Sequence, residues 1–166
     1  AAMTDIEKIH LLMVDDEEKF LNALTERLKL KFFDITPVTN GEDAIAVAQK
    51  AKFDVAVVDL QMPGIDGVEL LKILKKSHRF LEVIILSGHA TIDVAVDCTK
   101  LGAFKVLEKP CSFDKLVETI TEAYESRLKK KFEKDIDRMK KIQSLAFGQS
   151  PLGILRELKK MDDNQK

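Results

Sequence analysis

The sequence predicts an α/β protein with a doubly wound, five-stranded parallel sheet that is covered by helices. Short apolar runs of strand length alternate with segments in which apolar residues recur every three or four positions, as in successive βαβ units. Some runs, such as Val55–Val58, are apolar at consecutive positions, which is typical of strands covered on both faces. Hydrophobic residues make up 45% of the 166 residues and charged residues 33%, a composition typical of a globular protein with a core.

Each predicted strand is an apolar run of four to six residues. The five strands cover residues 9–14, 33–38, 55–58, 83–86 and 104–107. The segments between them repeat apolar residues at helical spacing. The predicted helices contain Phe20, Leu21, Leu24 and Leu28; Ala44, Ile45, Val47 and Ala48; Val68, Leu70, Leu71 and Leu74; and residues 92–101. Asn40-Gly41 and Met62-Pro63-Gly64 predict turns between elements.

A much longer helix is predicted from Ser112 onward. Between Phe113 and Leu145, apolar residues recur every three or four positions without an intervening Gly or Pro. At 1.5 Å per residue this helix would reach ~50 Å, more than one small domain covers. The half that follows Tyr124 therefore needs another surface to bury its apolar side. Gly148 is the predicted stop, and a second short helix follows with Leu152, Leu155, Leu158 and Met161 on one side.

Charge is distributed unevenly along the chain. Residues 1–125 contain 15 Lys and Arg against 22 Asp and Glu, whereas residues 126–166 contain 12 against 6. The resulting net charges, −7 and +6, sum to the −1 of the whole chain. Such asymmetry indicates two parts with different roles. We therefore predict a leader or tag (1–7), an α/β domain (8–125) and a basic helical extension (126–166).

Charged and hydroxyl side chains stand at the ends of four predicted strands. Asp15-Asp16 follows the first strand, Asp59 the third, Ser87 the fourth and Lys109 the fifth. The carboxyl ends of parallel strands meet at one edge of the sheet, where such folds bind ligands. Three crowded carboxylates raise one another's pKa unless a cation shares their site. An oxygen-rich cluster of this kind predicts a Mg²⁺ site with room for a phosphoryl oxygen.

These motifs resemble those of the receiver domains of two-component response regulators, over about residues 8–125. The motifs are Asp15-Asp16, Asp59 within DLQMPGIDG, Ser87-Gly88-His89, and Lys109-Pro110 within GAFKVLEKP. One Asp pair or one Lys-Pro is weak evidence, but four motifs in order, each after an apolar run, are specific. The resemblance implies a flavodoxin-like fold similar to that of the chemotaxis receiver.

The resemblance also implies roles for individual residues. Asp59 would be the phosphoacceptor, a carboxylate nucleophile that forms an acyl phosphate. Asp16, Asp59 and the backbone carbonyl of Gln61 would hold Mg²⁺, with Asp15 acting indirectly. The alternative for Asp15-Asp16 is a cap on the first helix, and the alternative for Asp59 is a cap on the turn that follows it.

The remaining implied roles concern the phosphoryl group and the conformational switch. Lys109, in a cis peptide with Pro110, would neutralise the phosphoryl oxygens. The Ser87 hydroxyl would bond one of them, unless it only caps the helix at 91–101. Gln61 and His89 occupy positions that tune phosphorylation and hydrolysis rates. Val106 stands where the family often has an aromatic switch residue, and its stiff side chain cannot replace the swing of a Tyr.

The sequence is compatible with three functions. The leading one is a phosphoacceptor switch that receives a phosphoryl group from a histidine kinase or phosphotransfer protein. A Mg²⁺-dependent aspartyl phosphohydrolase shares the carboxylates and lysine, but usually has an Asp where Gln61 stands. A transcriptional regulator is the third, using the basic tail or a DNA-binding part outside this sequence. We see no DNA-reading motif, so nucleic-acid contact stays open.

The sequence also supports expectations about the binding partner of the tail and about the cellular compartment. Leu128, Phe132, Ile136 and Met139 form an apolar stripe that predicts a homodimer or a helical partner. No apolar run approaches the ~20 residues of a membrane helix, and the first residues do not resemble an export signal. Cys98 and Cys111 fit no metal-binding spacing and are expected to be free thiols. We therefore expect a cytoplasmic protein without a membrane partner.

Overall fold

The computed structural model describes residues 8–146 and 151–164. The predicted leader and the predicted helix stop at Gly148 lie outside the described residues. The chain forms a five-stranded sheet whose strands are β1 (Ile9–Val14), β2 (Phe33–Val38), β3 (Val55–Val58), β4 (Glu82–Ser87) and β5 (Lys105–Glu108). The strand order is β2-β1-β3-β4-β5 and every pairing is parallel, which confirms the predicted fold.

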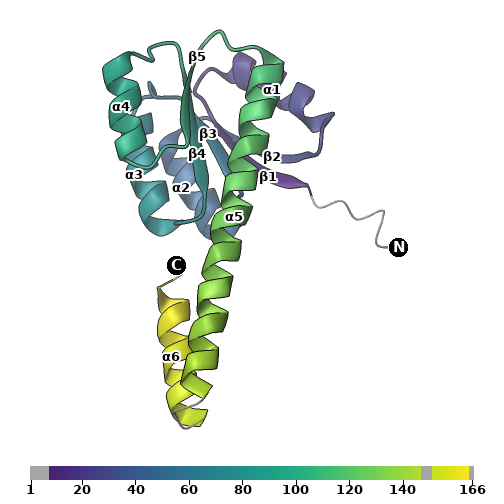
Figure 1. Cartoon of the computed structure of the whole chain (residues 1–166). Helices are drawn as coiled ribbons and strands as arrows, with labels where there is room; N and C mark the ends of the chain where they lie inside the picture. The colour runs from purple at the N-terminus through teal and green to yellow at the C-terminus, as the bar shows by residue number, and fades with distance from the viewer. Residues whose placement is uncertain (1–7, 147–150, 165–166) are drawn as a thin grey trace.

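Helices cover both faces of the sheet (Figure 1). They are α1 (Glu18–Lys29), α2 (Gly41–Lys50), α3 (Gly67–Ser77), α4 (Ile92–Lys100), α5 (Phe113–Ala146) and α6 (Pro151–Asp163). One buried cluster joins the sheet to α1 and α5, and the other joins it to α2, α3 and α4. In β1, Leu11 faces the first cluster and Leu12 the second. The period-2 alternation of side chains therefore explains why the strands are apolar at consecutive positions.

The long helix predicted from Ser112 is present as α5, which has 34 residues. Its start is capped by the Ser112 hydroxyl oxygen, which accepts a hydrogen bond from the Lys115 backbone N–H at 3.1 Å. The first third of α5 packs on the sheet through four buried residues: Leu116, Thr119, Ile120 and Ala123. The rest continues past the lower edge of the sheet (Figure 1).

Two ion pairs attach α5 to the lower edge of the sheet beyond Tyr124. The Arg127 Nε atom donates to Asp54 Oδ1 at 3.0 Å, and the Lys130 Nζ atom donates to Glu82 Oε1 at 2.9 Å. Glu82 is almost fully buried at the start of β4, so its carboxylate requires a cation. Contact between α5 and the α/β domain therefore extends past Tyr124 to Lys130, and Lys134 Nζ still lies 5.9 Å from the centroid of the Phe80 ring.

From Leu128 onward, α5 and α6 form a two-helix projection, which we call the arm (residues 128–146 and 151–163) and whose base includes Lys130. The helix α6 returns alongside α5 toward the sheet (Figure 1). Arg138 Nη1 on α5 pairs with Asp162 Oδ1 on α6 at 2.7 Å. Among the described residues, no helix combines the length and the hydropathy that crossing a bilayer requires.

Candidate functional site

Asp15 and Asp59 lie at the carboxyl ends of the neighbouring strands β1 and β3, at the edge where the winding of the sheet reverses. The backbone N–H of Asp59 donates to the Val14 carbonyl at 2.9 Å, which places the two carboxylates side by side. Their side chains are 5% and 7% exposed. Parallel pairing therefore brings together two polar residues that are 44 positions apart in the sequence.

Lys109 follows β5 and points toward both carboxylates. Its Nζ atom donates to Asp15 Oδ2 at 2.7 Å and lies 3.9 Å from Asp59 Oδ2. It also lies 4.2 Å from the ring centroid of Phe20, a cation–π contact that helps to orient the ammonium. The peptide bond between Lys109 and Pro110 is cis. The Lys109 ammonium is thus within reach of any anion bound to Asp59.

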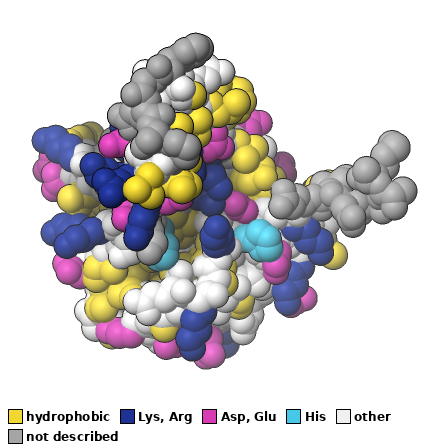
Figure 2. Space-filling model, turned by 90° about the horizontal axis from the view of Figure 1, so that it is seen from below, with side chains coloured by type: hydrophobic (Ala, Val, Ile, Leu, Met, Phe, Trp, Pro, Cys, Tyr) yellow, Lys and Arg dark blue, Asp and Glu magenta, His cyan; other side chains and the backbone are white. Residues whose placement is uncertain are grey.

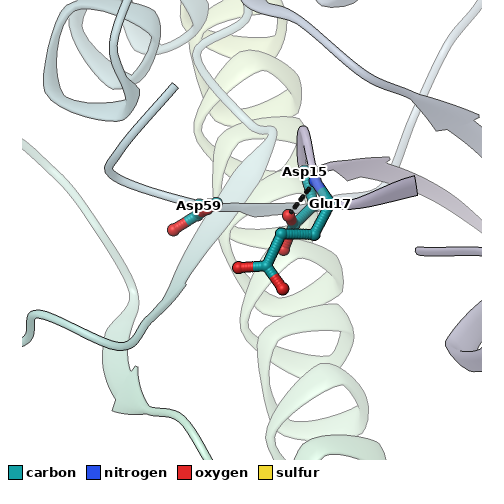
Figure 3. Close-up of side chains that lie close together, drawn as sticks. All are labelled: Asp15, Glu17 and Asp59. Carbon is teal, nitrogen blue, oxygen red and sulfur yellow. Dashed lines mark hydrogen bonds between the residues drawn. The ribbon is translucent and has the colours of Figure 1, made fainter. Parts of the chain in front are cut away.

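A third carboxylate completes the cluster. The side-chain oxygens of Asp15, Glu17 and Asp59 lie within 4.8 Å of one another (Figure 3). The Glu17 backbone N–H donates to Asp15 Oδ1 at 2.9 Å, which fixes the chain between the two acids. Hard oxygen donors from three carboxylates suit Mg²⁺, which keeps several waters and uses few protein ligands. The residues present therefore fit the expected ion.

Glu17 is a functional candidate that the sequence analysis missed. Asp16, the residue expected there, is exposed and lies outside the close group of three oxygens. The backbone N–H of Asp15 still donates to the Val38 carbonyl at 3.2 Å, so the chain remains extended one residue past β1. A bend at Asp16, together with the hydrogen bond from the Glu17 backbone N–H to Asp15 Oδ1, then places Glu17 beside Asp15. Such a bend has no periodic pattern in the sequence that could have predicted it.

The electrostatic environment raises the pKa of Asp59 above its ordinary value of 3.8. Desolvation by burial is the main cause, and the charge of Asp15 adds to it, with a smaller addition from Asp16. The nearby Lys109 ammonium and the backbone N–H of Gln61 oppose the rise because they stabilise the charged form. Burial and like charge dominate, so the metal-free cluster holds a destabilised carboxylate.

The other predicted residues surround the cluster. Ser87 ends β4 fully buried, and its Oγ atom accepts a hydrogen bond from the His89 backbone N–H at 3.2 Å. The Thr91 side chain caps α4, so Ser87 does not. The side chains of Gln61 and His89 are exposed, as expected for groups that control access. Val106 is partly buried and packs against the cluster that contains α2, α3 and α4.

In the metal-free protein, Asp59→Asn is expected to raise the free energy of unfolding at neutral pH, because it removes a carboxylate whose charged form is disfavoured by burial and by the charge of Asp15. A raised folded pKa stabilises the protein below pH 3.8, and this stabilisation is lost as pH rises through the folded pKa. The difference in the free energy of unfolding between variant and parent should therefore grow between pH 3.8 and the folded pKa of Asp59. It should stay constant at higher pH. Urea unfolding in EDTA at several pH values measures it.

The control for this experiment is Asp135→Asn, which removes an exposed carboxylate on α5 and should leave the stability unchanged. An Asp59→Asn variant less stable than the parent, or a difference that does not change with pH, would contradict the electrostatic account.

Comparisons with known proteins agree with this geometry. The sequence model of the response regulator receiver domain family matches residues 11–121. An NtrX-like response regulator of Rickettsia conorii is 38% identical over 120 residues, which are 71% of this chain and 25% of that protein. The transcriptional regulatory protein GlrR of Escherichia coli is 34% identical over 116 residues, 70% of this chain and 26% of GlrR. The chain thus spans about a quarter of the length of these relatives.

A solved structure shows the same fold. The receiver domain of the Francisella response regulator 1452 superposes with a TM-score of 0.68 at 30% identity, covering 72% of this chain and 98% of that domain. The family match includes Asp15, Asp59, Ser87 and Lys109, and it extends over about two thirds of the 166 residues. On this evidence the chain belongs to the response regulator receiver domain family.

Proposed function

We propose that this protein is the phosphoacceptor of a two-component system, in which Asp59 receives a phosphoryl group from a histidine kinase or a phosphotransfer protein. The observation that supports this most directly is the position of the Asp59 carboxylate, which lies 3.9 Å from the Lys109 ammonium, beside the Asp15–Lys109 ion pair, at the carboxyl edge of the sheet. A carboxylate nucleophile, neighbouring carboxylates and an ammonium group therefore lie close together at this edge.

In the proposed transfer, an Asp59 carboxylate oxygen attacks the phosphorus atom of a phosphohistidine. A P–O bond to Asp59 forms, the P–N bond to the donor imidazole breaks, and the imidazole keeps the electron pair. Lys109 neutralises the negative charge of the phosphoryl oxygens. Asp59 with Asp15 and Glu17, and Asp16 and the Gln61 backbone carbonyl as the resemblance implies, would hold Mg²⁺, which would supply further positive charge there.

Ser87 and its loop are proposed as the element that responds. The Ser87 hydroxyl would leave its present contact with the His89 backbone N–H and donate to a phosphoryl oxygen. That movement would draw residues 87–91 inward and shift α4. Val106 takes no part, because a β-branched side chain has one preferred χ1 rotamer. Gln61 and His89, exposed beside the site, would control the access of water and donor.

The experiment that tests this function is phosphorylation with acetyl phosphate and Mg²⁺, followed by intact mass. The parent and a control Asp93→Asn, changed at an exposed carboxylate on α4, should each gain one phosphoryl group. Asp59→Asn should gain none. Phosphorylation of the Asp59→Asn protein would contradict the assignment. Sustained hydrolysis of small phosphomonoesters would instead favour the phosphohydrolase, which we do not expect because Gln61 stands where that class has its acid/base Asp.

The output of the switch is also a proposal. We propose that residues 8–125 act as the receiver and residues 126–166 as the output helix pair, in the cytoplasm. The arm would bind a second copy of the chain. A second candidate is the receiver part of a transcriptional regulator, which the name of GlrR favours. Binding of DNA by a longer form of the protein, and its absence in this chain, would support that candidate.

A further inference from the structure

A groove lies at the opposite edge of the sheet from Asp59, beside the amino ends of β3 and β4. Its volume is about 790 Å³. The walls are the end of α2 with residues 51–53, the end of α3 with residues 77–81, and α5 at Arg127 and Lys131. Clefts of ~300–1,000 Å³ are typical of small-molecule sites. The groove is therefore large enough for an organic ligand, and it joins the α/β domain to the extension.

The floor and the rim of this groove differ in chemistry. Phe53, Leu74 and Leu81 supply a buried apolar floor. Four cations stand around it without an ion pair among the described residues: Lys50, Lys52, Arg79 and Lys131. No Asp or Glu is among the described residues that line the groove. In the view onto this side, Lys and Arg side chains gather around the base of the arm (Figure 2).

The walls are held by contacts that pair none of these four cations with a described acid, although the Arg79 guanidinium lies 5.6 Å from the centroid of the Phe80 ring. Lys75 Nζ donates to the carbonyl oxygens of Arg79 and Leu81, at 3.1 and 2.9 Å, and so fixes the loop between α3 and β4. On the other side, Arg127 is held by Asp54 at 3.0 Å. A site whose walls are fixed before binding loses less conformational entropy when a ligand enters. The groove is thus preorganised, while its charge remains uncompensated.

We propose that this groove binds a nucleoside phosphate, with the base and sugar on the apolar floor and the phosphates at the lysine rim. Four cations around one groove favour a ligand with several negative charges, which phosphates supply. Above this floor the lining includes Ile45, Ile73 and Phe80, which are partly exposed and which an inorganic anion would leave in contact with water, so a ligand with an apolar face is favoured. Because both walls contact the ligand, binding also holds α5 against the domain.

Isothermal titration of the full chain with ADP and GDP tests this proposal. It is done in EDTA and in the Asp59→Asn protein, so that the acidic site contributes nothing. We expect at least one of the two nucleotides to bind with a Kd below about 1 mM and at least about tenfold more tightly than inorganic pyrophosphate. Lys52→Ala with Lys131→Ala should weaken binding by about tenfold or more.

The matched control is Lys19→Ala with Lys100→Ala, which removes two exposed lysines that do not line the groove. This variant should bind like the parent, and circular dichroism should show the same fold in both double variants. Three results would each overturn the proposal: no binding of either nucleotide at about 1 mM, equal affinity for the better nucleotide and pyrophosphate, or the same loss of affinity in the control.

Discussion

Gly67→Ala is expected to destabilise the protein by about 3 kcal/mol, the upper end of the usual cost of overpacking. Gly67 begins α3, and its N–H donates to the Leu60 carbonyl at 2.9 Å. A Cβ atom at this position would clash with the carbonyl oxygen of Asp59 and would lie 2.6 Å from the Leu60 Cα. Both obstacles are backbone atoms, so relief requires movement of the segment that positions the Asp59 carboxylate.

The same variant should therefore lose activity as well as stability. We expect phosphorylation of Asp59 by acetyl phosphate to slow by about tenfold or more, because misplacing a reacting group by an ångström has effects of that order. Urea unfolding gives the free energy, and intact mass against time gives the rate. The two measurements are made on the same preparation.

Gly88→Ala is the matched control. A Cβ atom at Gly88 meets no atom within 4 Å, although this glycine also lies beside the functional site. Its free energy of unfolding should stay within about 0.5 kcal/mol of the parent's. If both alanine variants were equally stable, the close approach of α3 to the Asp59 backbone would not matter for folding.

The sequence was sufficient to predict the sheet and most of the site. Apolar runs alternating with helical stripes specify parallel βαβ units, and parallel strands bring their carboxyl ends to one edge. Asp15, Asp59 and Lys109 each follow such a run, so their convergence is a consequence of the fold. The start of α5 could also be predicted from the sequence, since Ser112 caps the helix through a local hydrogen bond.

Other features depend on packing between distant segments and have no local signal. Nothing near Lys130 in the sequence indicates a buried partner, yet this lysine pairs with the buried Glu82, 48 residues away. Arg127 likewise pairs with Asp54, 73 residues away. Whether a surface lysine meets a buried carboxylate is decided by how far α5 extends below the sheet. The spacing of residues along the sequence does not determine how far α5 extends below the sheet.

The arm retains an exposed apolar surface although α6 packs against α5. Leu128, Phe132 and Met139 on α5 are 49%, 65% and 62% exposed, whereas Ile136 of the same predicted stripe is partly buried. Leu152 and Leu155 on α6 are also exposed. Exposed apolar side chains gathered on one element are typical of interaction surfaces. Burial of the stripe by a second chain stays a prediction.

We expect the full chain to form a dimer through the arm when it is activated with beryllofluoride and Mg²⁺. Each large apolar side chain fully buried contributes ~1.5–3 kcal/mol. The three residues on α5 and two on α6 in each chain are 49–65% exposed, so burying the ten of a dimer gains roughly 9–18 kcal/mol, against an association cost of ~4–15 kcal/mol. The two quantities are of similar size, so a modest change in receiver conformation is enough to shift the equilibrium between monomer and dimer.

Phe132→Glu should abolish this dimer, because it places a charge at the centre of the apolar stripe, where desolvation of an unpaired carboxylate costs several kcal/mol. The control is Phe32→Glu, which changes the same residue type at almost the same exposure (64% against 65%) on the α/β domain rather than the arm. Sedimentation velocity of the parent and both variants, with and without beryllofluoride, gives the masses. A dimer that persists in Phe132→Glu, or is lost equally in Phe32→Glu, would place the interface elsewhere. A parent that stays monomeric in both states would show that the arm does not bind a second copy, since the exposed stripe would then be too small to offset the cost of association.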